Sequence, residues 1–336
     1  MVIDFGIIGY GWVARDYMLP ALTAHPRARL RAVVSPDAEH FRGLPEGVRT
    51  YASAEAMAAA EKLDAVYVAS PNHLHREHVE LALTEGWHVL CEKPLAADIR
   101  DARRLVAAVG LRPDLVYRTA YDQRHHAAHT QVQRLIQEGA VGNVTQVRID
   151  YACWLDAGWT ADNWRIDAAR AGGGAVIDLA PHGLDLVECL TGQRLEDLTV
   201  YLQHETHNYG VDDGGVLAGR LFGGILLVHT VGYNRPEKLP RRRLEIIGTE
   251  GSLLAINTMG QTAGGILIHI DAETGDRQEI DFSRTSPFAD QLQAFIHAIH
   301  HPTTTGHRNA DDDLRLAELL DAALVRASQP TPNPTY

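Results

Sequence analysis

The sequence predicts an α/β protein in which a doubly wound parallel sheet is followed by an α+β domain with an open, mostly antiparallel sheet. In the first third of the chain, short apolar runs alternate with helical stretches, a pattern typical of βαβ units. Beyond about residue 121, strands joined by glycine-containing turns favour antiparallel pairing. We therefore expect one domain over residues 1–121 and a second over 122–336, with the C-terminal helices able to pack back on the first.

The first domain is expected to consist of short apolar strands with helices between them. Ser53 and Asp98 are expected N-caps, and Gly86 and Gly110 are expected helix ends. The expected strands are Val2–Ile8, Leu30–Val34, Val48–Tyr51, Ala65–Ala69, Trp87–Cys91 and Leu115–Thr119. The expected helices are Trp12–Thr23, a stretch from Ser53 to about Lys62, His75–Thr84 and Arg100–Val109.

The second domain begins with helices and then becomes rich in strands. The expected helices are Ala127–Gln137, a stretch from the glycines at 172–174 to about Leu190, Phe288–His300 and Asp311–Ala327. The expected strands are Val144–Tyr151, Leu198–His204, Gly215–Leu221, Ile225–Val231, Arg243–Gly248, Ser252–Asn257, Ile266–Asp271 and Gln278–Phe282. Because an open sheet needs covering, we expect a homodimer or homotetramer that forms through this sheet.

Composition argues against several classes of function. The 336 residues include 31 Lys+Arg and 43 Asp+Glu, a formal net charge of −12, which argues against a nucleic-acid partner. Three cysteines without a CxxC pair indicate neither a disulfide framework nor a thiolate zinc site. The first residues lack the basic segment of a signal peptide, and no apolar run approaches the ~20 residues that cross a bilayer. We expect a cytoplasmic protein with no membrane partner.

A glycine-rich turn follows the first expected strand. Gly9, Gly11 and Ala14 match the pattern GxGxxA. The first small residue permits a tight turn, the second lets a pyrophosphate approach the backbone, and the third packs the helix on the strand. The position of the turn between a strand and a helix indicates a Rossmann-type dinucleotide site that also includes Trp12 and Val13.

The expected cofactor is NAD or NADP, and the sequence leaves the choice open. The residue that holds the adenosine ribose is expected ~20 positions after the turn, at the end of the second strand. That end reads Ser35-Pro36-Asp37: position 35 is not the acid that would favour NAD, and Ser35 is not followed by the arginine that would favour NADP. Asp37 can reach the ribose hydroxyls or can simply be the turn residue after a proline.

Two polar segments follow the fourth and fifth expected strands, where doubly wound sheets bind ligands. The first segment contains Ser70, Pro71, Asn72 and His75. The second contains Glu92 and Lys93. A lysine beside a desolvated cofactor can exchange protons, but the local pattern alone favours a solvated Glu92–Lys93 ion pair.

The helical stretch after the triple glycine carries a carboxylate and an imidazole four residues apart. Asp178 and His182 share one face of a helix, although Pro181 is expected to disturb the turn. An Asp that orients an imidazole forms an acid/base pair. A structural hydrogen bond between positions i and i+4 explains the spacing equally well.

Together these segments resemble the family of glucose-fructose oxidoreductase and inositol dehydrogenase, the Gfo/Idh/MocA family, over nearly the whole chain. The resemblance rests on GIIGYGWVA at 6–14, SPNHLH at 70–75, EKP at 92–94 and GGGAVIDLAPHGLD at 172–185. YDQRHH at 121–126 and Trp164-Arg165 also fit the family. The resemblance implies an N-terminal NAD(P)-binding Rossmann domain, a C-terminal domain whose open sheet commonly mediates oligomers, and oxidation of a sugar, cyclitol or similar polyol.

The resemblance also implies roles for single residues. The implied catalytic set is Lys93, Asp178 and His182. Glu92 and Asn72 would lie near the nicotinamide ribose. Ala180-Pro181 replaces a more usual Gly-Ser-like pair, and this departure affects the expected pose of His182.

Tryptophans gather in one loop before the triple glycine. Trp154, Trp159 and Trp164 can stack on the apolar faces of a sugar, and the acidic residues and glycines of this loop are unlike a core segment. Arg124 and Arg165 can bind a carboxylate or hydroxyls, or can form surface ion pairs instead. The expected substrate contacts are Lys93, Arg124, Trp164, Arg165, Asp178 and His182.

The sequence thus predicts a reversible alcohol/ketone oxidoreductase, with three alternatives. An NAD-dependent glycosidase of the same fold would oxidise its substrate only transiently, and a regulatory protein would bind the dinucleotide without catalysis. The third alternative is a metal hydrolase, which the 18 histidines suggest. In that case the pairs His125/His129 and Asp178/His182, each four residues apart, would supply the metal ligands. Because the chain also has the EKP segment, we favour ordinary helix-surface and loop histidines with one catalytic exception, and no metal.

Overall fold

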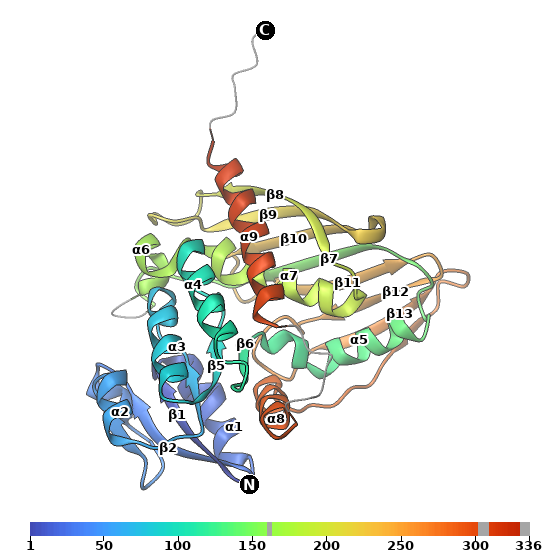
Figure 1. Cartoon of the computed structure of the whole chain (residues 1–336). Helices are drawn as coiled ribbons and strands as arrows, with labels where there is room; N and C mark the ends of the chain where they lie inside the picture. The colour runs from blue at the N-terminus through green and yellow to red at the C-terminus, as the bar shows by residue number, and fades with distance from the viewer. Residues whose placement is uncertain (160–162, 302–308, 330–336) are drawn as a thin grey trace.

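The computed structural model describes residues 1–159, 163–301 and 309–329, and these residues form two sheets with helices packed on them (Figure 1). The first sheet is parallel, with the strand order β3-β2-β1-β4-β5-β6. The strand order reverses direction at β1, so the predicted doubly wound sheet is confirmed. Its strands are β1 (Ile3–Ile8), β2 (Ala28–Val34), β3 (Arg49–Tyr51), β4 (Ala65–Val68), β5 (His88–Glu92) and β6 (Tyr117–Ala120).

The helices of this sheet follow the sequence pattern, with one irregularity. They are α1 (Leu19–Ala24), α2 (Ala54–Ala60), α3 (His75–Thr84) and α4 (Ile99–Gly110). The predicted caps are confirmed, because Ser53 accepts a hydrogen bond from the backbone of Ala56 and Asp98 accepts from Arg100 and Asp101. Ahead of α1, Ala14–Met18 form a π-helical turn, because Pro20 has no N–H with which to continue a regular α ladder.

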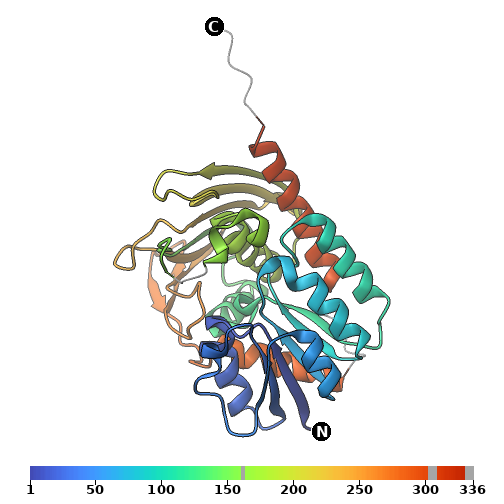
Figure 2. The same ribbon diagram turned by 90° about the vertical axis from the view of Figure 1, so that its left-hand side faces the viewer.

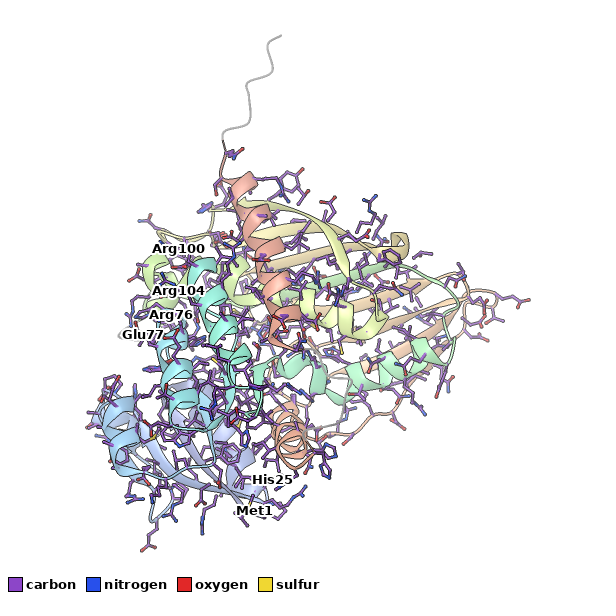
Figure 3. The ribbon with its side chains drawn as sticks, in the orientation of Figure 1. Met1, His25, Arg76, Glu77, Arg100 and Arg104 are labelled. Carbon is purple, nitrogen blue, oxygen red and sulfur yellow. The ribbon has the colours of Figure 1, made fainter. Side chains whose placement is uncertain are left out.

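The outer faces of α3 and α4 are charged. Arg76 donates hydrogen bonds to Glu80 at 2.8 Å within α3 and to Asp101 at 2.9 Å on α4. Figure 3 shows Arg76, Glu77 and Arg104 on this outer side of the first domain. These charges face solvent on the side of the two helices opposite the parallel sheet.

The second sheet has the strand order β14-β13-β12-β11-β7-β10-β9-β8. Its strands are β7 (Val144–Ala152), β8 (Leu195–Gln203), β9 (Gly214–Leu221), β10 (Leu226–Gly232), β11 (Arg242–Gly248), β12 (Gly251–Ile256), β13 (Ile266–Asp271) and β14 (Arg277–Glu279). The expected glycine turns join β9 to β10, β11 to β12 and β13 to β14, and each of these pairs is antiparallel. The pair β7–β10 is parallel, so the sheet is mixed but mostly antiparallel, as predicted.

Helices cover one face of this sheet. They are α5 (Ala127–Gln137), α7 (Ala175–Thr191) and α9 (Ala310–Ala327), and in both views they lie on the side of the sheet that faces the first domain (Figures 1 and 2). The short helix α6 (Ala168–Ala171) precedes α7. No described helix covers the opposite face of the sheet (Figure 2). Within the described ranges, no helix is long and apolar enough to cross a membrane.

The helix α8 (Pro287–His300) packs against the first domain although it follows the second sheet in the chain. The ring of Phe288 stacks on Tyr17 at 5.1 Å between centroids, and Phe295 lies 6.3 Å from Phe5 in a tilted arrangement. The first domain and α8 therefore share one apolar core. The boundary at residues 121/122 stays a prediction.

Candidate active site

One pocket lies at the carboxyl ends of β1, β4 and β5, where the two domains meet. Most of the predicted site residues line it: Gly11, Trp12, Val13, Ser70, Asn72, His75, Glu92, Lys93, Trp164, Arg165, Asp178 and His182. Tyr151, Asp122 and Gln261 also line it, and of these Asp122 and Gln261 were not predicted from the sequence. The ammonium of Lys93 and the imidazole of His182 therefore share a cavity with the glycine turn.

The glycine turn has the shape that a dinucleotide requires. Gly9 has a φ of +90°, and a Cβ at this position would overlap the backbone of Ser70. At Gly11, by contrast, no described atom lies within 4 Å of where a Cβ would be. The open space beside Gly11, at the start of the helical segment, leaves room for a pyrophosphate, so these residues fit NAD or NADP.

Lys93 lies directly after β5, and its peptide bond to Pro94 is cis. Its Nζ donates to Oδ1 of Asp178 at 2.6 Å and to the carbonyl oxygen of Asp178 at 2.8 Å. An ammonium has three N–H donors, so one remains for a ligand in the pocket. The locally favoured ion pair between Glu92 and Lys93 was wrong, because Lys93 reaches across to α7 instead.

Glu92 is held by the tyrosine on the neighbouring strand. The hydroxyl of Tyr67 donates to Oε1 of Glu92 at 2.5 Å. Burial raises the pKa of Glu92 to about 7, although the Tyr67 hydrogen bond and the charge of Lys93 act in the opposite direction. Near neutral pH this carboxyl group is therefore partly protonated.

Asp178 bonds to Lys93 and to a tyrosine, not to His182. Its Oδ2 accepts from the hydroxyl of Tyr233 at 2.8 Å. Burial alone would raise the pKa of Asp178, but the charges of Lys93 and Arg165 lower it far below the usual range. The expected hydrogen bond between Asp178 and His182 is thus corrected: both oxygens of Asp178 are engaged elsewhere.

His182 lies beside a carboxylate from another segment. Its Nδ1 is 3.2 Å from Oδ1 of Asp122, off the straight line of a hydrogen bond, and has no other polar partner among the described residues. The rings of Tyr121 and Tyr151 are roughly perpendicular to the imidazole, with centroid distances of 6.4 and 5.5 Å. Asp122 belongs to the YDQRHH segment, which resembles the family. Nothing in the sequence indicated that its aspartate faces His182.

The triple glycine places α7 against both domains. A Cβ on Gly172 would overlap the carbonyl of Ala97, and one on Gly174 would overlap the backbone of Asp212. The carboxylate of Asp212 accepts from the backbone N–H groups of Gly174 at 2.9 Å and Val176 at 2.8 Å, which caps the helix. The helix then continues through Pro181 to Thr191, so Pro181 does not end it.

The segment after β4 contacts the second domain. Nδ2 of Asn72 donates to the carbonyl of Ala171 at 2.8 Å. The two ring nitrogens of His75 lie 2.8 and 2.9 Å from the carbonyl oxygens of Pro94 and Ser70. Pro71 precedes the 3₁₀ turn Asn72–Leu74 and is not part of the pocket lining.

The end of β2 lies outside the pocket. The hydroxyl of Ser35 is 2.9 Å from Nδ1 of His40, and Asp37 accepts from the backbone of Glu39 at 2.9 Å. Asp37 therefore has the turn role that the sequence allowed, and its half-exposed carboxylate stays available to a ribose.

The tryptophan loop divides between the pocket and the surface. The guanidinium of Arg165 lies over Trp164 at 4.4 Å, Trp159 at 5.7 Å and Trp12 at 5.8 Å. Trp154 lies away from this group and packs edge-on against His207. Arg165 is therefore held at the pocket by three aromatic rings.

Arg124 does not line the pocket, which corrects the substrate role expected for it. Its guanidinium forms a two-pronged ion pair with the buried Asp185 and also contacts Asp313. These carboxylates raise the pKa of Arg124 beyond its already high value in spite of burial. Arg124 thus joins α7 to α9.

The histidines of the described ranges do not gather into a metal site. No group of three or more His, Cys, Asp or Glu side chains in the described part of the chain is arranged to hold a metal ion. His129 lies between the carbonyl of Gln123 and the hydroxyl of Thr258, each at 2.9 Å.

Comparison with protein families matches both domains. A model described as "Oxidoreductase family, NAD-binding Rossmann fold" matches residues 3–117, and one described as "GFO/IDH/MocA C-terminal domain" matches residues 129–254.

Among curated proteins, the chain is 30% identical to 1,5-anhydro-D-fructose reductase of Ensifer adhaerens, covering 90% of each chain. It is also 30% identical to dTDP-3,4-didehydro-2,6-dideoxy-alpha-D-glucose 3-reductase of Streptomyces violaceoruber, covering 95% of this chain and 94% of that protein. Among solved structures, it resembles a 3-ketoreductase from Actinomadura kijaniata in complex with NADP and TDP-benzene, with a TM-score of 0.84 and 26% identity over 97% of this chain and 98% of the other. The chain therefore belongs to the Gfo/Idh/MocA family of NAD(P)-dependent oxidoreductases.

Proposed function

We propose that this protein transfers a hydride between NAD(P) and a secondary alcohol or ketone of a sugar, cyclitol or related polyol. The observation that carries the proposal is the shared pocket: Lys93, His182 and the open side of Gly11 line one cavity. The relatives named above support a carbohydrate substrate, since both curated proteins are reductases of sugar derivatives.

The proposed chemistry divides between the cofactor and three side chains. When bound, the nicotinamide accepts or returns the hydride. His182 takes the proton of the substrate hydroxyl in the direction of oxidation. The free N–H of Lys93 donates to the same oxygen and stabilises the negative charge that develops there, while Asp178 holds the ammonium in place.

The remaining predicted contacts keep their proposed roles, with one exception. Trp164 and Arg165 line the pocket and are proposed to contact the substrate. Arg124 does not line the pocket and is not proposed as a substrate contact. The proposed dinucleotide contacts are Gly9, Gly11, Trp12, Val13, Ser35, Asp37, Ser70, Pro71, Asn72, His75, Glu92 and Lys93.

Lys93→Met tests the proposal. Turnover, followed as net NAD(P)H formation with a panel of sugars and cyclitols, should fall about 10³-fold, because the charge on the reacting oxygen loses its donor. Dinucleotide affinity, followed by fluorescence, should stay within about threefold, since only one of the many proposed contacts is removed. Net accumulation of NAD(P)H also distinguishes this function from a glycosidase that recycles its cofactor.

Lys62→Met is the matched control, because Lys62 is exposed on the first domain away from the pocket. It should retain full turnover. A thermal melt verifies that Lys93→Met is folded, since this change leaves Asp178 without its cation. Normal turnover by Lys93→Met would contradict the proposal.

The uncovered face of the large sheet is proposed to pair with a second copy of the chain. Tyr201, Val216, Leu226 and Val228 are exposed there, with Val216 directly opposite Tyr201 on the neighbouring strand. Apolar side chains gathered on one sheet face indicate an interface. Sedimentation should give a dimer or tetramer, and Val216→Asp should shift it to monomer; a monomeric parent protein would refute this pairing.

A further inference from the structure

We propose that Asp122 is the positioning residue for His182, in the role that sequence spacing suggested for Asp178. The inference rests on the proposed function, because it concerns the group that takes the substrate proton. Asp122 and His182 are each only 3% exposed, and their side chains meet at 3.2 Å. Two buried titratable groups at this distance interact strongly, since little water screens them.

Asp178 is not available for this role. One of its oxygens accepts from Lys93 and the other from Tyr233. Asp122, in contrast, offers Oδ1 to the imidazole, while its Oδ2 accepts from Nε2 of Gln123 at 2.9 Å. The carboxylate that serves the lysine and the carboxylate that serves the histidine are therefore different residues.

The segment that carries Asp122 is held by parts of the chain other than α7 as well as by the Arg124–Asp185 ion pair to α7. Asp122 begins the 3₁₀ turn Asp122–His125, directly after β6. The side chain of Gln123 donates to the carbonyl of Gly260 at 2.9 Å and accepts from the backbone of Gly260 at 3.3 Å. With its amide oriented to satisfy both of its atoms, Gln291 on α8 accepts from the backbone N–H of Asp122 at 3.1 Å. Three parts of the chain thus hold the carboxylate in front of the imidazole.

The contact between Asp122 and His182 indicates which ring nitrogen of His182 carries the proton and which one faces the substrate. A neutral imidazole has one N–H, and a carboxylate at Nδ1 favours the tautomer with the proton there. Nε2 is then left with its lone pair for the substrate hydroxyl. When His182 takes that proton, the nearby charge of Asp122 stabilises the imidazolium. The pKa of Asp122 is lowered, because the contacts with His182 and Gln123 outweigh its burial, so the carboxylate is ionised at neutral pH.

The other groups around His182 do not supply a negative charge to its imidazole. The rings of Tyr121 and Tyr151 are roughly perpendicular to the imidazole, and Lys93 is bound to Asp178 across the pocket. His229 lies behind α7, where a Cβ on Gly183 would overlap its ring. Burial lowers the pKa of His229 to about 4, so it is neutral and supplies no charge to His182 at neutral pH.

Asp122→Asn and Asp122→Glu test the assignment. In Asp122→Asn, kcat for alcohol oxidation should fall about 10²- to 10⁴-fold, with KM and dinucleotide affinity changed less than about threefold. The acid limb of the kcat profile should move to lower pH, because the imidazolium loses its neighbouring negative charge. Asp122→Glu should recover at least about tenfold of the lost kcat, since it restores the carboxylate.

Asp212→Asn is the matched control, because it shows what a displacement of α7 alone does to activity and to the pH profile. Asp212 is also buried and holds the start of this helix, but it does not line the pocket. It should lower the melting temperature without moving the pH profile. If Asp122→Asn keeps normal kcat, or loses activity with an unmoved pH profile as a structural variant would, the positioning role is overturned.

His182→Ala separates this inference from the proposed function. If His182→Ala retains normal turnover, the proposed function has the wrong base, whatever Asp122 does. If His182→Ala is inactive and Asp122→Asn is normal, the proposed function stands and only the positioning role fails.

Discussion

At the scale of single residues, the pocket gives each of its buried charged groups a specific partner. Glu92 has Tyr67, Asp178 has Lys93 and Tyr233, and Asp122 has His182. Burying a carboxyl group without such a donor is unfavourable by several kcal/mol. The pairs therefore explain how three acidic groups can stand close together in one cavity.

The two glycines of the turn should respond differently to alanine. Gly11→Ala places a methyl group in open space, so stability should stay within about 0.5 kcal/mol of the parent protein. The methyl group would occupy the space proposed for the pyrophosphate, and dinucleotide affinity should fall at least about tenfold. Gly9→Ala should instead destabilise the fold by about 2 kcal/mol or more, because the position has a positive φ and no room.

Chemical denaturation and fluorescence titration of the two variants check this contrast. Each variant serves as the control for the other, since the substitution is the same and the positions are two residues apart. Unchanged dinucleotide affinity in Gly11→Ala would show that the pyrophosphate does not approach this turn.

The sequence predicted which side chains share the pocket better than it predicted their hydrogen-bond partners. Lys93, Asp178 and His182 line one pocket, as the family resemblance implied. The i,i+4 spacing wrongly suggested a bond between Asp178 and His182, because spacing says nothing of competing partners. Asp122 and Tyr233 come from distant segments, and only the fold brings them to the site.

At the scale of elements, α7 is the carrier of the proposed chemistry. It brings Asp178 to Lys93 and His182 to Asp122 from successive turns of one helix. Its start is fixed by the carboxylate of Asp212 and by glycines that have no room for a side chain. Close packing at the helix start thus explains the triple glycine.

Most elements could be predicted because their apolar periodicity and caps are local. His75–Thr84 and Ala127–Gln137 match the predicted bounds residue for residue. The parallel pairing of β7 with β10 could not be predicted, since strands alternate in the same way in parallel and antiparallel pairs. The π-helical turn before Pro20 likewise depends on how the helix ladder adjusts to a missing donor.

At the scale of the whole molecule, the C-terminal segment ties the two sheets together. Phe288 and Phe295 of α8 complete the core of the first domain, and Ala310 at the start of α9 packs into the other apolar cluster on the same sheet. Sequence periodicity predicted both helices but not the surfaces that they cover. A long-range contact of this kind leaves no local pattern in the sequence.

The stability of the whole fold should decrease between pH 6.5 and pH 5, because three of the buried histidines have strongly lowered pKa values and are neutral in the native state. Burial lowers the pKa of His75 and His229 to about 4 and that of His129 to about 3. In the unfolded chain an imidazole titrates near ~6.5, so below that pH the unfolded state binds more protons. Each histidine then reduces the free energy of unfolding by about 1.4 kcal/mol per pH unit.

Glu92 acts in the opposite direction over the same range. Its native pKa of about 7 lies above the unfolded value of ~4.3, so the native state binds the extra proton and gains stability as the pH falls below 7. His75, His129 and His229 against Glu92 leave a net loss of roughly 2 to 3 kcal/mol per pH unit. The lowered pKa values of His78, His88 and His126 act in the same direction as those of the three histidines. The lowered pKa values of Asp122 and Asp178 add further loss only below about pH 4.

Urea unfolding at pH 7.5, 6.5, 5.5 and 5.0 measures how the free energy of unfolding depends on pH. Two variants should change this dependence in opposite directions. His229→Gln removes one titrating histidine and should flatten the dependence by about 1.4 kcal/mol per pH unit. Glu92→Gln removes the opposing group and should steepen it by a similar amount. If the free energy of unfolding is constant from pH 6.5 to 5 in the parent protein, then the buried histidines are protonated without unfolding, and the proposed balance of buried charges is wrong.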